Sequence, residues 1–175
     1  MRALLAIVCL TLSSWAHSDD RFYVEIHGGI GNIRVADLAF RPIEAHVSVG
    51  GYFIENIGID LTVGGSLIED DDDGFEAQTE EVASLSLRFD SPQKNKISAF
   101  ILVGVSQFTI QQEGTNSTGV SSTVSETFQG GTAALGFKRQ IADSPFSIVG
   151  VYRLHFVDEP IDLDSFSVGV RAAWK

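Results

Sequence analysis

The sequence predicts an all-β protein, specifically an eight-stranded antiparallel up-and-down transmembrane β-barrel. Three observations support this fold class. Eight segments alternate apolar and polar residues with the period of a β-strand. The connections between these segments are alternately long and short, as in outer-membrane barrels, whose long loops lie outside the cell and whose tight turns lie in the periplasm. The first eighteen residues have the layout of an export signal.

Residues 1–18 are predicted to form a secretory signal peptide. A basic start at Arg2 precedes the apolar run ALLAIVCLTL, and Ala16 and Ser18 form a small-residue cleavage site before Asp19. The apolar run is too short to cross a bilayer as a helix, which needs about 20 residues. We therefore expect a single barrel domain over residues 19–175, exported through a cleaved signal peptide to the outer membrane of a Gram-negative envelope.

The composition excludes several classes of function. The only cysteine, Cys9, lies in the signal segment, so no thiol or disulfide chemistry is expected after cleavage. The formal net charge of −11 provides no electrostatic basis for binding nucleic acid. No later segment approaches the roughly 20 apolar residues of a transmembrane helix. If the chain enters a membrane, it must therefore do so as strands.

The eight alternating segments are predicted as strands, and glycines inside several of them argue against helix. In chain order they are Phe22–Ile30, Glu44–Ile54, Asn56–Leu67, Glu76–Phe89, Lys96–Ile110, Ser125–Phe137, Phe146–Phe156 and Asp164–Trp174. Each is close to the roughly 9–11 residues that a tilted membrane strand needs. Alternation is clearest in NIGIDLTVGGSL, and it blurs in Phe100–Phe108, whose faces stay unassigned.

One face of these strands is almost entirely apolar, and the other is polar with few charges of mixed sign. A solvent-facing surface would tolerate many charges, whereas the filled interior of a small barrel would hold few, with serine and glycine filling the remaining space. Aromatic residues also lie near strand ends, as in interfacial girdles. We therefore predict that the apolar face contacts lipid. A soluble periplasmic ligand-binding barrel remains the alternative.

Five charged residues share the predicted inward face. They are Glu25, Asp60, Arg88, Arg153 and Arg171. Isolated charges are costly in a narrow interior, so we expect a polar network across the lumen, with Asp60 paired to Arg88 on the neighbouring strand. Such a network would plug the lumen. The chain is therefore not expected to be a general diffusion porin.

The mature chain resembles the small eight-stranded outer-membrane β-barrel family typified by the transmembrane domains of OmpA and OmpX. The closing segment SFSVGVRAAWK is similar to the family's C-terminal assembly signal, with apolar residues at every second position back from Trp174. FQGGTAALGFKRQ and FSIVGVYRLHF resemble the penultimate hairpin of the family. One departure is Lys175, which follows the aromatic residue on which the family usually ends. The resemblance implies recognition by the barrel-insertion machinery.

Three features of the sequence resemble part of a metal-binding or catalytic site, but none of them is complete. EDDDDGFEAQTE (residues 69–80) approaches a calcium-loop template, but strands rather than helices flank it, so we expect a solvated loop. His27, His46 and His155 share the inward parity, and we expect satisfied interior histidines rather than metal ligands. Some barrels similar to this family deacylate lipid A, but the hydroxyl expected two residues after His155 is missing. We expect no catalytic residue, no cofactor and no metal site.

The predicted function is structural and interactive. The barrel would anchor acidic or polar loops at the cell surface, in an adhesion or envelope-integrity role. Its expected partners are outer-membrane lipid and lipopolysaccharide, the insertion machinery and an extracellular or host ligand of the loops, with the chain itself a monomer. A lipid A-modifying enzyme is the second alternative.

Overall fold

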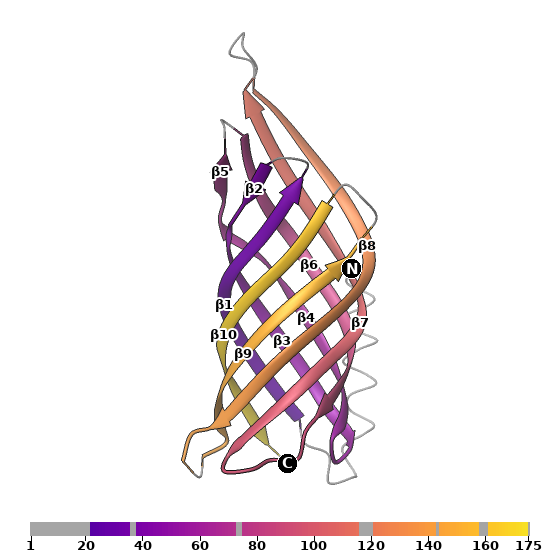
Figure 1. The fold of residues 1–175 in the computed structure, drawn as a ribbon, viewed down its shortest axis with the longest axis vertical. Helices are drawn as coiled ribbons and strands as arrows, with labels where there is room; N and C mark the ends of the chain where they lie inside the picture. The colour runs from indigo at the N-terminus through magenta and orange to yellow at the C-terminus, as the bar shows by residue number, and fades with distance from the viewer. Residues whose placement is uncertain are drawn as a thin grey trace.

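The computed structural model describes residues 22–35, 38–72, 75–115, 121–142, 144–157 and 161–174. They form a closed antiparallel β-barrel, which confirms the predicted fold class (Figure 1). Its eight long strands are β1 (Phe22–Val35), β3 (Ile43–Ile54), β4 (Ile57–Ile68), β6 (Phe75–Asp90), β7 (Ile97–Thr115), β8 (Ser121–Gln140), β9 (Phe146–Phe156) and β10 (Ile161–Trp174). Two short strands, β2 (Leu38–Phe40) and β5 (Asp70–Asp72), lie beside β1 and β6. The predicted signal segment lies outside the described residues.

Neighbouring long strands in the chain are neighbours in the barrel, so the topology is up-and-down. β1 pairs with β3, each following long strand pairs with the next, and β10 returns to β1. The closing pair runs over the whole of both strands, from Phe22 opposite Trp174 to Val35 opposite Ile161. Closure leaves no free edge around the body of the barrel, which is how a sheet satisfies its backbone groups inside a membrane.

Side chains alternate between the interior and the outer surface along most of each strand, with register shifts between Ile43 and Glu44, Tyr52 and Ile54, and Thr79 and Glu81. In β4, Gly58, Asp60 and Thr62 are buried, whereas Ile59 and Val63 are exposed. The same rule resolves β7, where Phe100 and Leu102 point inward and Ile101 and Val103 point outward. Both faces of this part of β7 are apolar, which is why its periodicity was too weak to assign. No helix among the described residues is long and apolar enough to cross a membrane.

Several strands run further at one end than their sequence periodicity predicts. β7 and β8 pair as far as Thr115 and Ser121, and their hairpin projects beyond the rest of the barrel (Figure 1). Most of the segment predicted as a long polar loop is therefore paired strand, and only residues 116–120 lie outside the described residues. A polar cross-strand contact accompanies the extension of β7, where Gln78 on β6 donates to the side-chain oxygen of Gln111 at 3.5 Å. We call this end of the barrel the outer end and the opposite one the turn end.

The acidic segment 69–80 forms a β-hairpin. Asp70, Asp71 and Asp72 of β5 pair with Ala77, Glu76 and Phe75 of β6, and residues 73–74 between them lie outside the described residues. A side-chain oxygen of Asp70 accepts a 2.7 Å hydrogen bond from the backbone N–H of Arg41. A β-hairpin therefore takes the place of the helix-flanked turn that a calcium loop of this template requires.

Candidate functional site

The interior of the barrel contains a buried charged network centred on Arg88. The side chain of Arg88 on β6 is fully buried. Its Nε donates to Asp90 Oδ1 at 2.8 Å, and its Nη1 donates to Glu25 Oε1 at 3.0 Å. The guanidinium also stacks on the ring of Phe100, with 3.7 Å between its central carbon and the ring centroid. Arg88 thus joins β1, β6 and β7 across the lumen.

Glu25 on β1 is the acid that the network shares. Its Oε1 accepts hydrogen bonds from Arg88 and, at 3.2 Å, from Nη1 of Arg171 on β10. Its Oε2 lies 3.0 Å from Nε2 of His27, two residues along the same strand. Arg171 also stacks on Tyr23 at 3.8 Å and donates to the hydroxyl of Tyr52 at 3.1 Å. The carboxylate of Glu25 is thereby bonded to two guanidinium groups, which offset the cost of removing its negative charge from water.

Asp60 on β4 lies in the same network, but its shortest bonds are to neutral groups. Its Oδ2 accepts from the Tyr23 hydroxyl at 2.7 Å, and its Oδ1 accepts from Thr62 at 2.8 Å. The predicted partner Arg88 lies at 3.7 Å, within ion-pair distance but further than Glu25 and Asp90. Gly50 makes this arrangement possible, because a Cβ at that position would overlap the Tyr23 hydroxyl.

Arg153 on β9 differs from the other four predicted residues because its hydrogen bonds are to hydroxyl groups. Its Nη2 donates to Thr62 at 3.2 Å, and its Nη1 reaches Ser84 at 3.5 Å. Within the described part of the chain, no carboxylate lies within ion-pair distance of it. Four of the five predicted residues therefore meet directly, and Arg153 connects to them through the Thr62 hydroxyl.

The structure adds three charged residues that sequence reasoning missed. Asp90 binds Arg88 and also pairs with Lys138 on β8. Glu44 on β3 contacts His46 at 3.1 Å and accepts from Thr79 at 3.1 Å. All three lie at the ends of predicted strands but have the inward parity of their neighbours. Extending the alternation by one residue would have found Asp90 and Lys138, whereas Glu44 is already the first residue of its predicted strand and has the inward parity of His46. With them, four acids match four bases in the described interior.

The three inward histidines do not form a metal centre, and no metal-binding group of three or more ligands occurs among the described residues. His27 and His46 each contact the carboxylate two residues earlier. His155 meets a hydroxyl that its own strand lacks, because Ser106 on β7 lies 2.9 Å from its Nδ1. The sequence shows no hydroxyl two residues after His155, and the one that His155 meets comes from a different strand. Both side chains are buried in the lumen, with His155 against Phe108, away from the outer surface of the barrel.

An apolar layer lies above the charged network, toward the outer end. It is a cluster of buried residues from five strands, comprising Ile33, Phe40, Ala77, Val82, Phe108, Ile110, Ile161 and Leu163. Phe40 of the short strand β2 belongs to this cluster. The layer and the network below it both lie inside the described barrel. At the turn end the interior widens into a polar cavity of about 540 Å³.

Comparison with known proteins identifies the architecture. No protein-family model matches the chain, and no curated protein sequence is significantly similar to it. One similar structure is that of Ail, the attachment invasion locus protein of Yersinia pestis, in complex with the heparin analogue sucrose octasulfate. Its sequence is 11% identical to this chain, the TM-score is 0.65, and the alignment covers 90% of this chain and 100% of Ail. Neisserial surface protein A is 15% identical with a TM-score of 0.62, covering 86% and 96%. The outer-membrane protein OprG of Pseudomonas aeruginosa is 11% identical with a TM-score of 0.59, covering 89% and 95%.

The chain therefore has the fold of the small eight-stranded outer-membrane β-barrels. The sequence resemblance of its closing strands to this class of barrels is thus confirmed for the fold. Charged pairs and an apolar layer occupy the described part of its interior.

Proposed function

We propose that this protein is an outer-membrane barrel that anchors surface-exposed hairpins, in an adhesive or envelope-stabilising role, and that it is not a general diffusion porin. The observation that carries the proposal is the combination of an apolar outer surface with an interior that buries a network of charged and polar side chains. In a soluble barrel the two faces would be reversed, because apolar residues would fill the core.

The outer surface supports membrane insertion. Large apolar side chains from all eight long strands are solvent-accessible on it. They include Ile26, Val47, Val63, Leu85, Val103, Leu135, Ile148 and Val168. Monomeric soluble proteins rarely expose contiguous apolar surface of this extent. Aromatic residues occur where the barrel would meet the interfaces, with Phe89, Phe137 and Trp174 near the turn end.

The outer end of the barrel supports a role in binding an extracellular partner. The β5–β6 and β7–β8 hairpins continue beyond the apolar layer and carry acidic side chains, among them Asp71, Glu76 and Glu80. A sulfated sugar such as the one bound to Ail would be repelled by these carboxylates. We therefore propose a neutral or basic extracellular partner. The lipid A-modifying alternative is not favoured, because the Ser106–His155 pair lies in the interior.

Location has a direct test. Protein recovered from a Gram-negative expression host should fractionate with the outer membrane and begin at Asp19, as the signal layout predicts. Unboiled, it should resist dodecyl sulfate and migrate on a gel differently from the boiled protein, because a folded membrane barrel keeps its closed hydrogen-bond network in detergent. Recovery in the soluble periplasm, or identical mobility before and after boiling, would exclude the membrane-barrel proposal.

Conductance tests the closed interior. Purified protein in planar bilayers is expected to conduct ions poorly or in rare brief openings, because Arg88, Glu25 and the apolar layer occupy the lumen. The control is the conductance of a known porin that is reconstituted in the same way. Large steady currents from this protein would contradict the plugged lumen while leaving its membrane location intact.

A further inference from the structure

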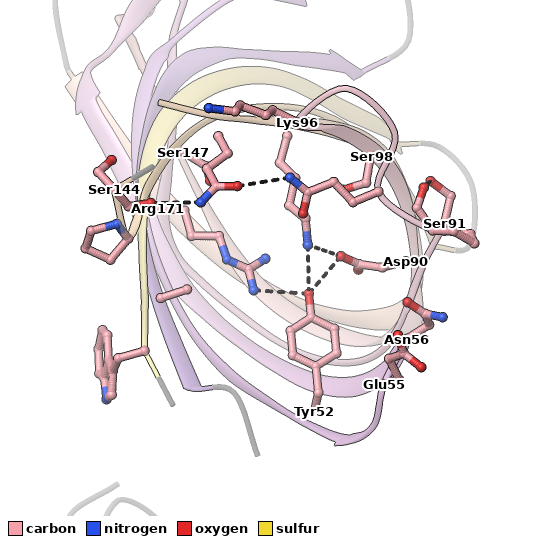
Figure 2. A pocket seen from close by; sticks show the side chains of 17 residues that line it. Tyr52, Glu55, Asn56, Asp90, Ser91, Lys96, Ser98, Ser144, Ser147 and Arg171 are labelled. Carbon is pink, nitrogen blue, oxygen red and sulfur yellow. Dashed lines mark hydrogen bonds and ion pairs between the residues drawn. The ribbon is translucent and has the colours of Figure 1, made fainter. Parts of the chain in front are cut away.

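The cavity at the turn end is separate from the apolar layer and opens at the mouth formed by the short turns. It is bounded by the connections around residues 55–56 and 91–96 and by the ends of β7, β8, β9 and β10. Figure 2 shows the Tyr52 hydroxyl at its floor, between Arg171 and Asp90. The cavity is lined largely by polar side chains, yet nothing in the proposed anchoring role uses it.

The acid at the floor of this cavity is already satisfied. Asp90 Oδ1 accepts from Arg88, and its Oδ2 accepts from the Tyr52 hydroxyl at 2.8 Å and from the ammonium of Lys138. The Tyr52 hydroxyl in turn accepts from Arg171 at 3.1 Å. These groups hold the floor rigidly and leave little acceptor capacity for a cationic ligand.

Hydrogen-bond donors remain unused on the wall. Ser98 is only 4% exposed, and its hydroxyl has no partner among the described residues. Buried hydroxyls are nearly always bonded, so this one is available to donate to a group that enters the cavity. Lys138, its direct cross-strand partner in the β7–β8 register, carries three N–H groups, of which Asp90 and Tyr52 take two. The two donors belong to the same level of the barrel wall, since paired residues have Cβ atoms about 5 Å apart.

The charge of the lining matches this donor surplus. Its cations are Lys96, Lys138 and Arg171, and its acids are Glu55 and Asp90. The lining thus carries one more cation than acid, with Arg171 also bonded to Glu25 below the floor, although the whole chain has a formal charge of −11. A ligand that brings negative charge and acceptor oxygens would complement both properties.

We infer that the turn-end cavity binds a small oxyanion, a phosphate or carboxylate group, which accepts hydrogen bonds from the Ser98 hydroxyl and the Lys138 ammonium while Arg171 supports its charge. This site goes beyond the anchoring role and does not depend on it. In the proposed orientation the cavity faces the periplasm, so its ligand would come from that compartment rather than from the cell surface.

Inorganic phosphate and acetate, titrated separately into the folded full chain in detergent micelles at constant ionic strength, test the inference. Phosphate is followed by ³¹P line broadening and acetate by ¹H line broadening, with chloride as the reference ion. At least one of the two is expected to saturate with one site per chain. Ser98→Ala is expected to weaken that binding roughly tenfold, since it removes one hydrogen bond to a charged group. Saturation by acetate alone would support the site and restrict its ligand to carboxylates.

Two further variants separate the site from general effects. Ser91 lies on the rim of the same cavity, but its hydroxyl already accepts a hydrogen bond from the backbone N–H of Ala99 at 3.0 Å. The Ser91→Ala variant should therefore bind the anion with the affinity of the wild type. Lys138→Gln should weaken binding at least as much as Ser98→Ala. Each variant is first checked for the gel shift on boiling. An unsaturable response equal to that of chloride, or unchanged affinity in folded Ser98→Ala and Lys138→Gln, would overturn the inference.

Discussion

Arginine in place of Leu85 is expected to lower the free energy of unfolding by about 2–4 kcal/mol, the cost of a lipid-facing cation near the bilayer midplane. Leu85 is 52% exposed on the outer surface of β6. It lies between Leu61 on β4 and Val105 on β7, within a continuous apolar row. The measurement is urea unfolding of the barrel in lipid vesicles.

Val124→Arg provides the matched control for this prediction. Val124 is also apolar and 60% exposed, but it lies on the outer part of β8, which pairs only with β7 beyond the body of the barrel. Outside the hydrocarbon layer the same substitution should cost about 0–1 kcal/mol. Equal losses at the two positions would show that the loss at Leu85 does not report a lipid-facing surface.

Removal of the Arg88 side chain is expected to cost about 3–5 kcal/mol of unfolding free energy, the typical cost of breaking a buried ion pair. Arg88→Ala leaves Glu25 with Arg171 as its remaining guanidinium partner and deprives Asp90 of one of its two cations. It also opens space against the Phe100 ring on which the guanidinium stacks. Equilibrium unfolding in urea, with the boiling shift as the check of folding, measures the loss.

Double-mutant cycles rank the partners of Arg88. The coupling energy between Glu25→Ala and Arg88→Ala should exceed that between Asp60→Ala and Arg88→Ala, because Arg88 lies 3.0 Å from Glu25 and 3.7 Å from Asp60. Asp60 also keeps its bonds to Tyr23 and Thr62 when Arg88 is removed. Strictly additive losses for Glu25 and Arg88, or the reverse order of couplings, would contradict the network described above.

The sequence by itself determined the fold class, the number of long strands and the direction in which most side chains point. These properties depend on a local rule, since successive residues of a strand face opposite sides whatever the rest of the chain does. Glu25, Asp60, Arg88, Arg153 and Arg171 were all placed in the interior by this rule, and all five are buried there. The rule did not resolve Phe100–Phe108, where both faces are apolar, nor did it extend to Asp90 and Lys138 beyond the predicted strand ends.

Only the tertiary structure decided which interior groups meet. Glu25 and Arg171 are 146 positions apart, and Ser106 and His155 are 49 apart, so their contacts depend on the strand register and on closure of β10 against β1. The same closure creates the turn-end cavity, and the register sets the unpartnered Ser98 beside Lys138. The physical reason is that alternation fixes the face of each residue, whereas shear and closure of the barrel fix its height and its neighbours across the lumen.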